Sequence, residues 1–75
     1  MNEAYYDAIV QKIENTGLEG SASWSEKWGF ASCIINTPHS KTQVAYLRVR
    51  FPEQLASLVD IFLKSWQDVQ DRSLL

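Results

Sequence analysis

The most constraining feature of the sequence is an alternation of residue types along positions 42–51. One set of alternate positions is wholly apolar: Ala45, Leu47, Val49 and Phe51. The other set is half apolar and half basic: Val44, Tyr46, Arg48 and Arg50. Successive side chains of a strand point to opposite faces of a sheet, so the pattern predicts a strand with the first set on its core face.

Helices are predicted on both sides of this strand. Residues 2–16 carry apolar side chains at helical spacing, with Asn2 as the N-cap and Gly17 as the C-cap. Pro52 ends the strand and suits the first turn of a second helix over residues 52–71.

The segment between the first helix and the alternating strand predicts a hairpin. Residues 30–36 read as a strand, and the turn-forming residues 36–41 read as the loop that follows it. Residues 20–25 have two interpretations: a further strand, which we favour, or an ordered loop held by Trp24 and Trp28.

The order is therefore helix, two or three antiparallel strands, helix. We expect an α+β fold in two layers, with both helices on one face of the sheet, and one domain over residues 1–75. A domain of this size buries only about 60% of the surface that its unfolded chain exposes. Its stability is therefore small, and a partner subunit would add to it.

The single cysteine, Cys33, predicts a reducing compartment. One cysteine cannot form an internal disulfide, which small secreted domains usually need. No signal peptide is recognisable, and no apolar run approaches the roughly 20 residues that span a bilayer. We expect a cytoplasmic protein without membrane contact, in which Cys33 is a small buried side chain.

The second helix is apolar over a wide arc. At about 100° per residue its apolar positions extend over nearly 200°, whereas a helix on a sheet needs somewhat more than about 100°. Two interpretations stay open: either the first helix covers the surplus, or a partner does. The predicted partner interface consists of Ile61, Leu63, Trp66 and Leu74.

Charge is segregated along the chain. Every charged residue between Glu26 and Glu53 is basic, whereas the two helical segments are acidic overall. Tyr46, Arg48 and Arg50, with Lys41 nearby, predict an aromatic and cationic sheet face. Such a face binds single-stranded nucleic acid or an acidic protein, or it is simply a solvated surface. The net charge of −2 disfavours nucleic acid.

Catalytic signatures are missing from the sequence. Cys33 and His39 form the only possible thiol–imidazole pair, with no evident third group to orient the imidazole. The sequence predicts no cofactor and no metal site, because one Cys and one His without nearby carboxylates cannot build one. We therefore do not expect an enzyme.

One stretch resembles the double-stranded RNA-binding domain. Pro38-His39 stand in a loop before a strand that ends Arg48-Val49-Arg50, within a helix–strands–helix order. That family opens its last helix with a lysine cluster, where this chain has Pro52-Glu53-Gln54, and it has two strands after the loop, where this chain has one clear strand. The chain is not assigned to that family.

The sequence leads to two hypotheses of function. The favoured one is a small, non-catalytic regulatory or accessory protein that binds another protein and forms a homodimer. The alternative is a nucleic-acid-binding module that uses the basic and aromatic sheet face.

Overall fold

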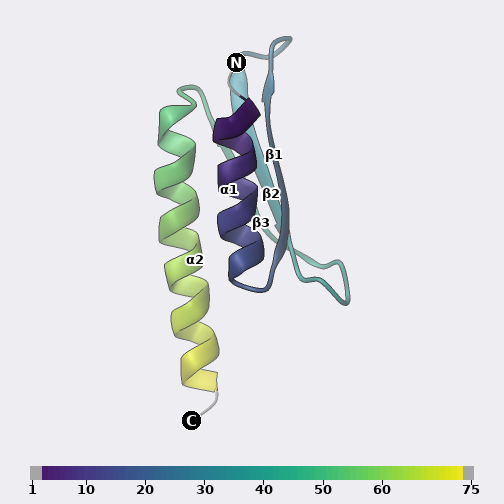
Figure 1. The fold of residues 1–75 in the computed structure, drawn as a ribbon, viewed down its shortest axis with the longest axis vertical. Coiled ribbons are helices and arrows are strands. Elements are labelled where there is room, and N and C mark those ends of the chain that lie inside the picture. The colour runs from purple at the N-terminus through teal and green to yellow at the C-terminus, as the bar shows by residue number, and fades with distance from the viewer. Residues whose placement is uncertain (1–2, 74–75) are drawn as a thin grey trace.

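The computed structural model describes residues 3–73 and contains two helices and a three-stranded sheet. The elements are α1 (Glu3–Asn15), β1 (Glu19–Ser25), β2 (Phe30–Asn36), β3 (Gln43–Val49) and α2 (Glu53–Ser73). The antiparallel sheet has the order β1-β2-β3, and both helices lie on the same side of it (Figure 1). The predicted α+β order is confirmed, and residues 20–25 belong to a strand.

The central strand β2 carries the middle of the core. Ala31, Cys33 and Ile35 point toward the helices and are fully buried. The register places Ala22 and Trp24 of β1 on the same face, beside Cys33 and Ala31. The helices cover this face with six buried residues: Tyr6, Ile9, Ile13, Leu55, Val59 and Leu63.

The end of α1 is a Schellman motif, which sets the direction of the chain into β1. The Leu18 N–H donates to the Ile13 carbonyl at 3.3 Å, and the Gly17 N–H donates to the Glu14 carbonyl at 3.0 Å. Gly17 has φ +86°, a conformation that glycine adopts without a steric cost. The predicted C-cap is confirmed, and the motif buries both Leu18 and Ile13.

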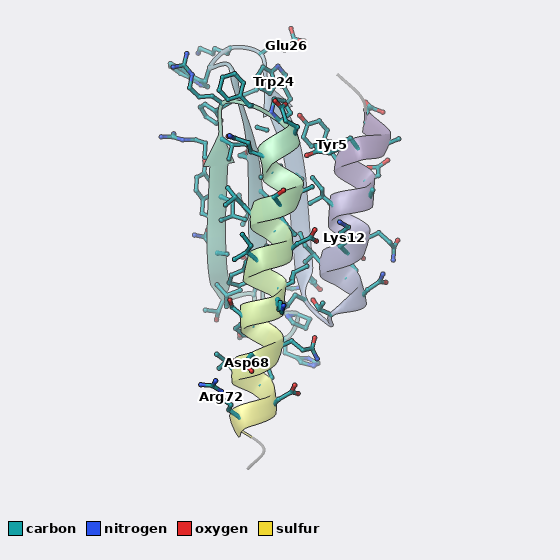
Figure 2. The ribbon with its side chains drawn as sticks, turned by 90° about the vertical axis from the view of Figure 1, so that its left-hand side faces the viewer. Tyr5, Lys12, Trp24, Glu26, Asp68 and Arg72 are labelled. Atoms are coloured by element: carbon teal, nitrogen blue, oxygen red, sulfur yellow. The ribbon has the colours of Figure 1, made fainter. Side chains whose placement is uncertain are left out.

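A side-chain hydroxyl joins the two helices. The Tyr5 hydroxyl donates to the Pro52 carbonyl and accepts a hydrogen bond of 3.2 Å from the Ala56 N–H. It therefore satisfies one of the backbone amides that the first turn of a helix leaves without a partner. Further along both helices, Lys12 of α1, which Figure 2 labels, forms an ion pair of 3.2 Å with Asp60 of α2.

The strand predicted over residues 42–51 is shorter than expected, and Phe51 does not belong to the core. The strand ends at Val49, and Phe51 is 59% exposed. The Phe51 carbonyl accepts the Gln54 N–H at 2.9 Å, so the chain has already turned toward α2 at this point. Alternation along a strand no longer decides where Phe51 points.

The helix ends differ from the prediction by one or two residues. The predicted N-cap Asn2 lies outside the described residues, and α2 extends to Ser73.

Within residues 3–73, neither helix combines the length and the apolar character needed to cross a membrane.

The close approach of α1 to β1 makes Gly20→Ala a test of the packing. A Cβ at Gly20 would lie 2.7 Å from Ile13 Cδ1 and 3.2 Å from the Ile34 carbonyl oxygen. Ile13 is fully buried, so its side chain has to shift within the packed core. We expect the substitution to lower the free energy of unfolding by about 1–3 kcal/mol in urea denaturation. The exposed neighbour Ser21 provides the control, since Ser21→Ala should change the free energy of unfolding by less than about 0.5 kcal/mol. Equal stability of the two variants would contradict the close approach.

The buried thiol makes stability depend on alkaline pH. Burial raises the pKa of Cys33 from 9.0 to about 11. Between these values the unfolded chain has lost the thiol proton and the folded protein keeps it, so rising pH favours unfolding. We expect the free energy of unfolding to fall as the pH rises from 9 toward 11. Urea denaturation at stepped pH should show a smaller fall for Cys33→Ala. Burial also raises the pKa of Tyr6, which acts in the same direction in both proteins. Identical pH slopes would contradict the prediction.

Candidate protein-binding surface

One side of α2 remains exposed and apolar. At about 100° per residue, Leu58, Ile61 and Val69 lie about 60°, 120° and 40° to one side of the fully buried Leu55. Ile61 is 63% exposed and Val69 57% exposed. Ser65, also exposed, falls between them on the same side. We call Leu58, Ile61, Ser65 and Val69 the α2 flank.

The α2 flank points away from α1. Ala56 and Asp60, which contact Tyr5 and Lys12 of α1, lie on the opposite side of Leu55, at about 100° and 140°. The first helix therefore covers one side of α2 and leaves the other uncovered. The chain itself therefore covers only part of the wide apolar arc that the sequence predicts for the second helix.

The α2 flank lies on the side of the free edge of β3. The helix α1 packs on β1, whereas α2 packs on β3 and β2. Because the sheet order is β1-β2-β3, the direction away from α1 leads to the outer edge of β3. Figure 2 shows α2 between α1 and that strand. Helix flank and strand edge therefore face the same side of the molecule.

The last turns of α2 extend past the end of α1 (Figure 1). A helix of 21 residues is about 31 Å long, whereas a strand of 7 residues spans about 23 Å. Val69 lies in this overhang. Trp66, half-buried just before it, stacks on Phe62 with ring centroids 6.2 Å apart.

Of the predicted interface residues, Ile61 is on the α2 flank and Trp66 is half-buried beside the core. Leu63 has to be removed from the prediction, because it is only 7% exposed and packs in the core. It lies on the side of α2 that α1 covers. Leu74 lies outside the described residues.

The outer face of the sheet carries Tyr46 and Arg48, as predicted from the alternation. The register pairs Tyr46 with Ile34 and Arg48 with Ser32, whose neighbours in β2 point to the core. Arg48 lies over the Phe30 ring at 4.7 Å. Arg50 follows just after β3. A shallow depression of about 360 Å³ is lined by Trp28, Gly29, Phe30, Arg48, Val49 and Arg50.

Lys41 does not join this basic face. It lies in the loop between β2 and β3, with φ +57°, and forms an ion pair of 2.6 Å with Glu19 at the opposite end of the sheet from Arg50. Trp28 takes a place in the depression instead, and it is 68% exposed. No pattern in the sequence separates such a turn tryptophan from one that anchors a loop.

A second depression, of about 510 Å³, is acidic and aromatic. It is lined by Glu3, Tyr6, Asp7, Ala22, Ser23, Trp24 and Glu26. The buried Tyr6 hydroxyl has no hydrogen-bond partner among the described residues.

Within residues 3–73 no group of three or more His, Cys, Asp or Glu side chains is placed to hold a metal ion.

Cys33 and His39 are not brought together. Cys33 faces the helices in the middle of β2, and His39 is exposed in the loop after that strand. Burial raises the pKa of the Cys33 thiol to about 11. The thiol is therefore protonated at neutral pH and is a poor nucleophile.

Comparisons with known proteins find no matching family, no matching curated protein and no matching solved structure. The helix, three-strand, helix order is shared with the double-stranded RNA-binding domain. However, Pro38-His39 lie between the second and third strands here, whereas that family has its Pro-His loop between the first two.

Proposed function

We propose that this chain is a small, non-catalytic regulatory or accessory protein that acts by binding protein, and that it forms a homodimer through the α2 flank. The observation that carries the proposal is the exposure of Ile61 and Val69 on the side of α2 that α1 leaves uncovered. Exposed apolar patches on small soluble domains mark interaction surfaces.

The energetics support a protein partner for this surface. Fully burying an Ile or Val side chain contributes about 1.5–3 kcal/mol relative to leaving it exposed. Because a domain of this size has a small stability of its own, covering the α2 flank would stabilise the fold as well as the complex. A two-fold symmetric homodimer is the commonest arrangement that does this.

Replacing Ile61, the most exposed hydrophobic residue of the α2 flank, tests the proposal. At concentrations of a few hundred micromolar, light scattering after size-exclusion chromatography should give the wild-type chain a mass near twice 8.6 kDa. Ile61→Lys places a charge in the contact and should raise the dimer dissociation constant by more than about tenfold. Gln67→Lys adds the same charge to another exposed position of α2 and should leave the dimer intact. A wild-type mass of 8.6 kDa would contradict the homodimer.

A second candidate function is the binding of single-stranded nucleic acid. It is favoured by the depression in which Trp28, Phe30 and two arginines meet, because aromatic rings stack on bases and arginines contact phosphates. The overall acidity of the chain opposes it.

This second candidate predicts salt-sensitive binding of a fluorescent oligothymidine. The double variant Arg48→Glu, Arg50→Glu should abolish binding in fluorescence anisotropy. The double variant Lys64→Glu, Arg72→Glu makes the same change in net charge on α2, away from the depression, and should weaken binding only slightly. Unchanged affinity in the Arg48, Arg50 variant would exclude this function.

A further inference from the structure

The edge strand β3 offers a second contact on the same side as the α2 flank. An edge strand has unpaired backbone groups that can pair with another chain unless charges, proline or bulges block it. Val44, Tyr46, Leu47 and Val49 give β3 a high preference for sheet structure, and its irregularity is confined to the end near Asn36. The other edge strand, β1, is rich in serine instead.

From the rise per residue of a strand and of a helix, Tyr46 and Ile61 are expected at about the same height in the molecule. The short connection after Val49 makes α2 run back along β3 (Figure 1). Tyr46 is three residues before the end of β3, which is about 10 Å along the strand. A helix covers about 10 Å in roughly seven residues, which leads from Glu53 to Asp60 and Ile61.

A two-fold axis at this height brings exposed apolar residues of the two copies to the same levels. Val69 lies about 12 Å from the level of Ile61 in one direction, at eight residues along the helix. Phe51 lies roughly as far from it in the other direction, beyond the end of β3. Rotation about the axis therefore brings Val69 of one copy to the level of Phe51 of the other, and Leu58 to the level of Ser65.

The spacing between the two α2 helices also fits such a dimer. Because α2 packs on both β2 and β3, its axis lies over the space between them. Adjoining β3 strands about 4.8 Å apart would then place the two α2 helices roughly 10 Å apart. Helices pack at about 8–10 Å.

Close to the two-fold axis, charges do not oppose this arrangement. Near a two-fold axis each side chain meets its own copy, so a charged residue there would repel itself. Tyr46, Ile61 and the flanking Leu58 and Ser65 are uncharged. Arg48 lies two residues from the centre, so the two copies of Arg48 would be four residues apart along the ladder, about 13 Å.

From these observations we infer that the occupant of the α2 flank is a second copy of this chain, joined by antiparallel pairing of the two β3 strands centred on Tyr46. The two sheets form one continuous six-stranded sheet, and the α2 helices pack over the junction. Five of the six large hydrophobic side chains that are exposed within residues 3–73 lie on or beside the elements that this contact joins, the sixth being Trp28. The inference rests on the proposed homodimer and specifies its geometry.

Single cysteines on the outer face of β3 test the register. With antiparallel pairing at Tyr46, Tyr46→Cys places two Cα atoms about 4.5–5.5 Å apart, within the range that a disulfide requires. Arg48→Cys, on the same strand and the same face, places its two copies too far apart. Tyr46 is 50% exposed on the outer face, so its replacement leaves the core unchanged. Cys33 is buried in both variants.

In a glutathione buffer with about 10 µM protein, Tyr46→Cys should form a disulfide-linked dimer on the order of a hundredfold faster than Arg48→Cys, because pairing holds the thiols at an effective concentration near millimolar. Adding Ile61→Lys should remove this advantage, and adding Gln67→Lys should retain it. Amide hydrogen exchange in the unmodified protein should show β3 protected as a central strand, and less protected in Ile61→Lys.

The outcomes separate the inference from the proposed function. A dimeric mass with equal linking rates at positions 46 and 48, and a rapidly exchanging β3, would overturn the edge pairing and leave a dimer that uses α2 alone. A monomeric mass with slow linking at both positions would overturn both.

Discussion

The fold depends on how closely the helices approach the central strand. Ala31, Cys33 and Ile35 of β2 are fully buried. Because Ala31 and Cys33 are small, α1 and α2 can both pack close to the backbone of β2. Gly20 lets α1 come still closer on the β1 side, where Ile13 fills the space that a side chain would occupy. The same contacts position α1 over β1, and α2 therefore sits toward β3. The asymmetry that leaves one flank of α2 open beside the edge of β3 follows from this packing.

The two surfaces proposed for binding lie at different places on the molecule. The α2 flank and the β3 edge lie at the side of the sheet, whereas the depression with Trp28 and Arg48 lies on its outer face. A dimer joined along β3 would carry both depressions on one extended face. The proposed dimer and the proposed binding of a ligand on the outer face would therefore be compatible in the same assembly.

Much of the fold could be predicted because local patterns agreed with it. The alternation before Val49, the Gly17 cap and the apolar spacing in both helices each identify an element and its inner face. Phe51 was misplaced because the turn after Val49 breaks the alternation. Leu63 was misplaced because the helical pattern gives the width of an apolar arc but not which side the neighbouring helix covers. The free edge of β3 likewise depends on the order of the strands, which no local pattern contains.

The hydroxyl of Tyr5 has a consequence for how the chain matures. Its partners at Pro52 and Ala56 are 47 and 51 residues further along the chain. The buried face of α1 and β2 also needs Leu55, Val59 and Leu63, which the ribosome adds later than every strand. Until α2 emerges, the nascent hairpins expose the residues that become the core, and such surfaces aggregate or recruit chaperones. The domain therefore becomes able to fold only after the residues of α2 that complete its core have emerged.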